Sequence, residues 1–237
     1  MATAASSFRD AWQSVLQAVF PSQCVCCGDV LVRGERYVCL TCLGNLRHTH
    51  FSAINDNPVE RRLATRIPIV HATAMLHFQR GNTVQSLVHS MKFNGSAELC
   101  IHMGRQLGLE LLRSARFDDV DLLVPVPLHW TRRLTRGYNQ SELLCRGISQ
   151  TFGRQVNTTA LKRHRYTRKQ SRRHASDRER NVSGAFGLRH PDQLSGHHIL
   201  LVDDVMTTGA TLASCAQALS SVPDLSISVA TLSVAGD

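Results

Sequence analysis

The sequence predicts an α/β domain with a largely parallel sheet and flanking helices, preceded by a small cysteine-rich module. Short apolar strand patterns alternate with amphipathic helix patterns from residue 67 onward. Hydrophobic residues make up 43% of the 237 residues, which is enough for one medium domain with a packed core. Four cysteines form two Cys-x-x-Cys pairs near the N-terminus. We expect four segments: a helix at 1–20, a zinc knuckle at 21–50, a linker at 51–66 and the α/β domain at 67–237.

The elements are predicted from the spacing of apolar residues. Helical spacing from Phe8 to Val19 favours an amphipathic helix over residues 7–20. The run Asn55-Asp56-Asn57-Pro58 argues against regular structure in the linker. Beyond it we expect strands at 67–78, 121–126, 198–202 and 226–234, and helices at 83–93, 97–112, 139–150 and 208–221. Such alternation is typical of a parallel sheet covered on both faces.

The charge balance suggests an anionic partner. The formal net charge is +9 and the sequence pI is about 9.6, which suits a nucleotide, a diphosphate sugar or a nucleic acid. A basic protein without such a partner is the alternative. No apolar run reaches the ~20 residues of a membrane-spanning helix, and the N-terminus lacks a signal-peptide pattern. We therefore expect a cytoplasmic protein without an integral membrane segment.

The cysteine pairs predict a structural metal site. In a reducing compartment, Cys24 with Cys27 and Cys39 with Cys42 have ligand spacing rather than disulfide character. Four thiolates around Zn²⁺ form a closed tetrahedral site, which also supplies folding energy to a segment with little core. The alternatives are reduced cysteines without metal, or a redox pair.

Other residues offer substitutes for these ligands. Cys26 lies inside the first pair, and His48 and His50 follow the second. The remaining cysteines occur in helix patterns and are expected to be small core residues: Cys100, Cys145 and Cys215.

The segment after the strand at 198–202 is the strongest candidate for ligand binding. Asp203 and Asp204 follow the strand directly, and a Thr/Gly turn then leads into a helix; that turn and helix start comprise Thr207, Thr208, Gly209, Ala210 and Thr211. Open α/β sheets bind ligands at the carboxyl ends of their strands. The hydroxyls, the glycine and the helix N-terminus suit a phosphate, whereas the carboxylates suit ribose hydroxyls or Mg²⁺. A simple capped helix is the alternative.

This segment resembles the phosphoribosyl pyrophosphate motif of type I phosphoribosyltransferases. Three further features are similar to the ComF family (ComFC and GntX-like proteins). They are Pro125-Val126-Pro127-Leu128 with Arg133 and Arg136-Gly137-Tyr138-Asn139-Gln140; the series Thr167, Gln170, Arg178, Asn181, Val182, Ala185 and Phe186; and the four-cysteine module. The resemblance covers nearly the whole chain and implies a phosphoribosyltransferase-type fold.

The resemblance implies roles for the candidate residues. The acidic pair would bind the ribose hydroxyls, and the Thr/Gly loop would bind the 5′-phosphate, with Mg²⁺ carried by the diphosphate. Arg132, Arg133 and Arg136 around Gly137 would face the pyrophosphate, a geometry that guanidinium groups favour. Lys92 resembles the family's Lys-aromatic-x-Gly element and would reach the same pocket.

The basic segment at 162–180 resembles a loop that closes over substrate. It holds nine Lys or Arg residues against two acids, and it includes Gln170 and Arg178. The chain departs from the family at Arg172-Arg173-His174, where an apolar residue is typical, which weakens the prediction of a hydrophobic lid. The segment equally suits a single-stranded phosphate backbone, or a solvated loop.

Three classes of function follow. The first is a phosphoribosyltransferase or related hydrolase acting on phosphoribosyl pyrophosphate with Mg²⁺. The second is a binding protein that keeps the pocket for a nucleotide or for single-stranded DNA without turnover. The third is an adaptor that docks onto proteins of the DNA-uptake machinery. The resemblance implies a role in natural transformation or in the use of DNA as a nutrient.

Overall fold

The computed structural model describes residues 22–93, 96–164 and 184–236. The chain divides into two compact units, the first ending at Leu46 and the second beginning at Arg47. The predicted helix at 7–20 and residues 165–180 of the predicted loop lie outside the described residues. Within the described part, no helix has the length and apolar character needed to cross a bilayer.

The first unit is built from turns and one short helix. An isolated antiparallel bridge joins Gln23 to Val30 around the turn that carries the first cysteine pair. Helix α2 (Leu40–Gly44) begins after Cys39. The Glu35 carboxylate accepts hydrogen bonds from the backbone N–H groups of Leu40 (2.7 Å) and Val32 (2.9 Å), which lowers the pKa of Glu35. Buried apolar side chains are few among its described residues, so packing alone gives this unit little stability.

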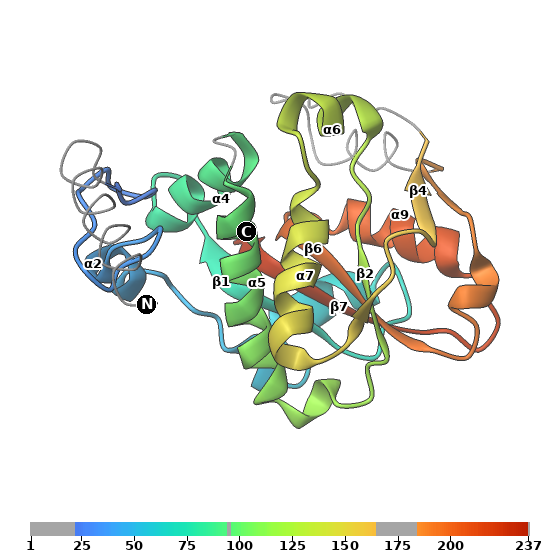
Figure 1. The fold of residues 1–237 in the computed structure, drawn as a ribbon. Coiled ribbons are helices and arrows are strands. Elements are labelled where there is room, and N and C mark those ends of the chain that lie inside the picture. The colour runs from blue at the N-terminus through green and yellow to red at the C-terminus, as the bar shows by residue number, and fades with distance from the viewer. Residues whose placement is uncertain (1–21, 94–95, 165–183, 237) are drawn as a thin grey trace, which may run out of the picture. The chain divides into compact units, whose positions relative to one another are not determined.

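The second unit is built around a five-stranded parallel sheet (Figure 1). The strands lie in the order β1-β7-β6-β2-β3. Their bounds are β1 (Ala72–Phe78), β7 (Ser226–Ala235), β6 (His198–Met206), β2 (Leu122–Pro125) and β3 (Gln155–Val156). The predicted parallel sheet with flanking helices is therefore confirmed.

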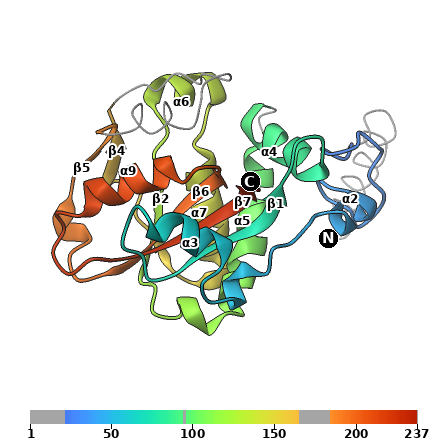
Figure 2. The same ribbon diagram turned by 180° about the vertical axis from the view of Figure 1, so that it is seen from behind.

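Helices cover both faces of the sheet. Helices α5 (Ala97–Leu112) and α7 (Gln140–Phe152) lie together on the face toward the viewer in Figure 1. Helices α3 (Pro58–Ala64) and α9 (Ala210–Leu219) cover the opposite face, which Figure 2 shows in front. The central strand β6 is apolar from Ile199 to Val202 because both of its faces are buried.

The remaining elements connect these layers. Helix α4 (Thr83–Phe93) follows β1, and α6 (Trp130–Arg136) lies between β2 and α7. A second, antiparallel sheet consists of β4 (Leu161–Arg163) and β5 (Phe186–Leu188). Three short 3₁₀ helices complete the described part: η1 (Phe51–Ala53), η2 (Ala115–Phe117) and η3 (Pro191–Gln193). Cys100, Cys145 and Cys215 are buried in helices, as predicted.

The prediction of an irregular linker at 51–66 is wrong, because α3 occupies Pro58–Ala64. Asn57 caps this helix by accepting hydrogen bonds from the N–H groups of Val59 (3.0 Å) and Glu60 (3.1 Å). Glu60 completes a capping box, and Pro58 occupies the first helical position, where a missing N–H costs nothing. The residues that suggested a break are therefore those that start the helix.

The sequence also missed some shorter elements. Helix α6 has no buried residue, so no apolar periodicity marks it, and β3, β4 and β5 have at most three residues each. Strand β6 was predicted to end at Val202, but it continues to Met206 because β7 keeps pairing with it, for example at Asp203↔Thr231. The two aspartates therefore belong to the strand instead of following it.

Helices α5 and α7 approach each other through glycines. A Cβ atom at Gly147 would lie 2.8 Å from the backbone nitrogen of Arg105 and would overlap the carbonyl oxygen of Ile101. A Cβ atom at Gly104 would likewise overlap the carbonyl oxygen of Leu144. The backbones of the two helices are thus in direct contact, which fixes the position of α7 against the sheet.

Candidate functional site

A cavity of about 420 Å³ lies at the carboxyl ends of β1, β2 and β6 in the second unit. The acidic part of its lining is Asp203 and Asp204 of β6. The basic part is Lys92, Arg132, Arg136 and Arg163, and Thr207 and Thr211 contribute hydroxyls. The structure thus brings to one cavity Asp203, Asp204, Thr207 and Thr211 of the residues predicted for the ribose phosphate, whereas three others do not line it: Thr208, Gly209 and Ala210.

The two carboxylates are held by neighbouring donors. Asp203 Oδ1 accepts hydrogen bonds from Ser141 Oγ (3.0 Å) and from the backbone N–H of Asp204 (2.9 Å). Asp204 Oδ2 forms an ion pair with Lys92 Nζ at 2.8 Å, and both side chains are largely buried. Burial, and then the adjacent charge of Asp204, raise the pKa of Asp203 to about 7.

The raised pKa of Asp203 predicts a pH-dependent stability. The folded protein holds this proton more tightly than the unfolded chain, whose Asp pKa is ~3.9. The contribution of Asp203 to the free energy of unfolding is therefore fully present below about pH 4 and is lost as pH rises through 7. We expect Asp203→Asn not to show this loss. The thermal midpoint of the variant should therefore rise relative to that of wild type as pH increases from 4 to 8. Parallel curves for Asp203→Asn and wild type would contradict the assignment, and the exposed Asp192→Asn is the control.

Lys92 is positioned by the end of α4. The backbone carbonyl of Met91 accepts hydrogen bonds from Tyr138 Oη (2.9 Å) and Gln140 Nε2 (3.3 Å). Asn139 Nδ2 donates to the carbonyl of Val126 (3.0 Å), so the same segment also holds the loop after β2. The Tyr138-Asn139-Gln140 segment therefore ties together two walls of the cavity.

The arginines divide into two groups. Arg132 and Arg136 line the cavity, and burial lowers the pKa of Arg136. Arg133 does not line it, because its guanidinium lies 3.5 Å from Glu142 Oε2 and its side chain is 60% exposed. Gly137 ends α6 in the left-handed region at φ 80° and does not line the cavity. Arg163 of β4 also lines the cavity. The sequence did not single it out because it lies within the basic segment at 162–180, where no local pattern distinguishes one cation from the others.

The Thr/Gly turn before α9 is supported by α3. Thr208 Oγ1 accepts a hydrogen bond from the N–H of Ala210 (3.4 Å), and Gly209 adopts φ 78° as the N-cap. Arg62 Nη1 donates to the carbonyl oxygens of Thr207 (2.8 Å) and Ala235 (2.9 Å). A Cβ atom at Gly209 would lie 2.9 Å from Leu63 Cδ2. The sequence missed Arg62 and Leu63 because it did not predict α3.

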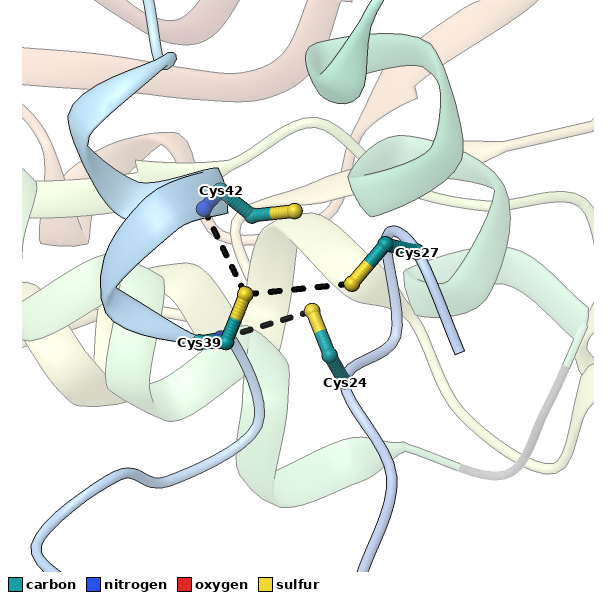
Figure 3. Close-up of side chains that lie close together, drawn as sticks. All are labelled: Cys24, Cys27, Cys39 and Cys42. Carbon is teal, nitrogen blue, oxygen red and sulfur yellow. Dashed lines mark hydrogen bonds between the residues drawn. The ribbon is translucent and has the colours of Figure 1, made fainter. Parts of the chain in front are cut away.

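The four paired cysteines of the first unit form one cluster. All four sulfur atoms, those of Cys24, Cys27, Cys39 and Cys42, lie within 4.8 Å of one another and point toward a common centre (Figure 3). The Cys27 and Cys39 sulfurs are 3.8 Å apart. Zn–S bonds of ~2.3 Å in a tetrahedron put two sulfurs ~3.8 Å apart, so the cluster fits a zinc knuckle.

Within the cluster, the environment of Cys24 favours the thiolate, whereas the pKa of Cys27 is raised to about 11 and that of Cys42 is also raised. Cys24 Sγ accepts hydrogen bonds from the N–H groups of Cys39 (3.3 Å) and Cys26 (3.4 Å). Burial raises the pKa of Cys24, but backbone N–H donors outweigh it and lower that pKa to about 6. Cys26 is not part of the cluster, and burial raises its pKa to about 12. His48 and His50, the other substitutes considered, belong to the second unit.

Some candidate residues lie outside the described part of the chain. These are Gln170 and Arg178 of the predicted lid, together with Thr167, Asn181 and Val182 of the family-like series. Ala185 and Phe186 of that series are described and are buried in the core.

A segment of the chain is similar to curated proteins of known name. Over 136 residues it is 40% identical to the DNA utilization protein YhgH of Escherichia coli K12. This match covers 56% of this chain and 59% of that protein. It is 32% identical over 130 residues to Competence protein F of Haemophilus influenzae, which covers 53% and 57%. The resemblance to the ComF family is confirmed. The match spans less than two thirds of the length of either relative. No family model matches this chain.

Proposed function

We propose that this chain binds phosphoribosyl pyrophosphate, with Mg²⁺, in the cavity beside β6. The observation that carries the proposal is the placement of two carboxylates, four cationic side chains and the hydroxyls of Thr207 and Thr211 around one cavity. The carboxylates suit the ribose hydroxyls, and the turn with its helix N-terminus suits the 5′-phosphate. Arg132, Arg136 and Lys92 suit the diphosphate, which would bring Mg²⁺ with it.

Calorimetric titration tests the proposal. We expect phosphoribosyl pyrophosphate with Mg²⁺ to bind wild type, and Asp203→Asn/Asp204→Asn to bind it about 100-fold more weakly or not at all. Each hydrogen bond to a charged group is worth ~1.5–3 kcal/mol, and two such groups are neutralised. The double variant Asp192→Asn/Asp224→Asn is the matched control, because it removes the same charge from exposed positions outside the cavity. Equal affinities for the two double variants, or no binding by wild type, would overturn the proposal.

We further propose a structural Zn²⁺ in the four-cysteine cluster and a role in DNA utilisation or uptake. The sulfur geometry supports the metal, and the names of the relatives support the role. A reducing compartment such as the cytoplasm suits the free thiols of the eight cysteines, all of which lie in the described part.

Helix α6 supports single-stranded DNA binding as a second candidate function. Trp130 is 63% exposed and Leu134 is 76% exposed, one turn apart on this helix. Arg133 on the same helix is also exposed, and Arg132 and Arg136 of this helix line the cavity. Exposed aromatic rings among cations are the features that bind unpaired bases and their phosphates.

Fluorescence titration tests this candidate. In a Trp12→Phe background, Trp130 is the remaining tryptophan, so quenching by a single-stranded oligonucleotide of about 12 nucleotides reports on α6. We expect Trp130→Ala to weaken binding about tenfold, since base stacking is worth ~1–3 kcal/mol. Leu112→Ala, at an exposed apolar position elsewhere, should leave affinity unchanged. An affinity that does not change with salt concentration would contradict this function. An affinity that Trp130→Ala leaves unchanged would also contradict it.

A further inference from the structure

The members of the four-cysteine cluster differ in their access to solvent. Three of them are buried, with at most 8% of the residue exposed: Cys24, Cys39 and Cys42. The fourth, Cys27, is an exposed residue. Access to solvent decides which thiolate of a site a dissolved reagent meets first. A small reagent in water therefore reaches Cys27 before it reaches the other three members.

The exposed sulfur of Cys27 has a second sulfur beside it. Cys39 Sγ lies 3.8 Å away, and a dashed line in Figure 3 joins the two atoms. Because an S–S bond measures ~2.05 Å, the two sulfur atoms need to approach by less than about 2 Å to form one. Cys27 belongs to the turn between the bridge partners Gln23 and Val30, whereas Cys39 is the residue before α2. A bond between them would join the two halves of the first unit.

A hydroperoxide can oxidise this pair in two balanced steps. The Cys27 thiolate attacks one oxygen of hydrogen peroxide, the O–O bond breaks, and a sulfenic acid forms on Cys27 as hydroxide leaves. The Cys39 thiolate then attacks the sulfenic sulfur, and the S–S bond forms as a second hydroxide leaves. The two thiolates lose two electrons in total, and the two peroxide oxygens gain them. The cluster is left with Cys24 and Cys42, which are only two of the four ligands of a closed zinc site.

Loss of Cys39 as a ligand also affects α2. Cys39 is the N-cap of this helix, and its sulfur accepts a hydrogen bond from the backbone N–H of Cys42 (3.4 Å). The helix has five residues, and buried apolar side chains are few among the described residues of this unit. A metal ion would therefore supply most of the folding energy of the unit, and its release would unfold residues 22–46. The second unit has a hydrophobic core of its own and would stay folded.

We propose that Cys27 and Cys39 form a peroxide-sensitive redox site, in which a disulfide between them expels Zn²⁺ and unfolds the first unit. The oxidant is a hydroperoxide, and a dithiol reductant together with fresh Zn²⁺ restores the folded unit. This inference rests on the proposed Zn²⁺ in the cluster, and it gives that structural site a second, oxidised state.

Zinc release from the full chain tests this redox site. Hydrogen peroxide is added to zinc-loaded protein in the presence of 4-(2-pyridylazo)resorcinol, whose absorbance reports free Zn²⁺. We expect wild type to release its zinc about tenfold faster than Cys27→His, because histidine still binds zinc but cannot form the disulfide. Cys42→His has the same donor set of three cysteines and one histidine but keeps the Cys27–Cys39 pair. It should therefore also release zinc faster than Cys27→His.

Peptide mapping by mass spectrometry supplies an independent readout. Arg33 and Arg36 lie between the two cysteines, so trypsin puts Cys27 and Cys39 on separate peptides that only a disulfide joins. Wild type should give this linked pair after brief oxidation. The control Cys26→Ser should give the same pair at the same rate, because the Cys26 sulfur is not a member of the cluster.

The outcomes separate the redox site from the metal site. Zinc release without the Cys27–Cys39 disulfide would overturn the redox site and leave the proposed Zn²⁺ standing. Equal release rates for wild type and Cys27→His would overturn it in the same way. If wild type binds no zinc, the proposed structural metal fails, and the redox site fails with it.

Discussion

Replacing Cys39 and Cys42 with serine is expected to release the bound metal and to unfold residues 22–46. Two of the four thiolates of the cluster are lost, and the unit has few other buried side chains among its described residues. Structural Zn²⁺ sites in small modules contribute ~10–16 kcal/mol of binding free energy, which exceeds what this core supplies. Elemental analysis should give one zinc per chain for wild type and close to none for the double variant. Amide hydrogen exchange at Leu40 should rise accordingly.

Cys26→Ser is the matched control for this experiment. Cys26 lies in the same turn as two ligands, but its sulfur is not a member of the cluster. The metal content and the exchange rates should therefore stay at wild-type values. Zinc retained after loss of Cys39 and Cys42, or lost after Cys26→Ser alone, would show that the four-cysteine assignment is wrong.

Gly147→Ala is expected to destabilise the second unit by about 3 kcal/mol or more, at the upper end of overpacking effects. The added methyl group would collide with backbone atoms of α5, and backbone cannot rotate away as a side chain can. The helices must separate, and α7 must then shift against β6 and β2. Chemical denaturation followed by circular dichroism measures the change.

Gly236→Ala provides the comparison for Gly147→Ala. A Cβ atom at Gly236 has no neighbour within 4 Å, so the same substitution there should change the free energy of unfolding by less than about 0.5 kcal/mol. An unchanged denaturation midpoint for Gly147→Ala would mean that α5 and α7 are not in backbone contact.

The elements that could be predicted from the sequence are those in which buried apolar side chains follow a regular pattern. Strand β6 was found because Ile199 to Val202 are all buried, and α4, α5 and α7 because their apolar faces repeat at helical spacing. Its end at Met206 was missed because the partner strand β7, and not local sequence, keeps Asp203 and Asp204 in the sheet. Helix α6 was missed because all of its side chains remain accessible.

Helix α3 shows a different kind of failure. The signals for it, Asn57 as N-cap, Pro58 and Glu60, are present in the sequence, but Asn57 and Pro58 were interpreted as evidence against regular structure. For the cavity, the acidic pair and the threonines could be named from local pattern, and Lys92 from the resemblance to the ComF family. Arg163 and Arg62 could not, because only the tertiary fold brings them beside cavity and turn residues that are distant in the sequence.

The two hydrogen bonds of Arg62 have a thermodynamic consequence. Because one guanidinium holds the carbonyls of Thr207 and Ala235, the turn before α9 is fastened to α3 and to the end of β7. Its backbone conformation is therefore fixed during folding, and a ligand that binds there loses little conformational entropy of the loop. Affinity at this cavity should consequently be limited by desolvation of the charged side chains, while the turn itself acts as a preorganised receptor.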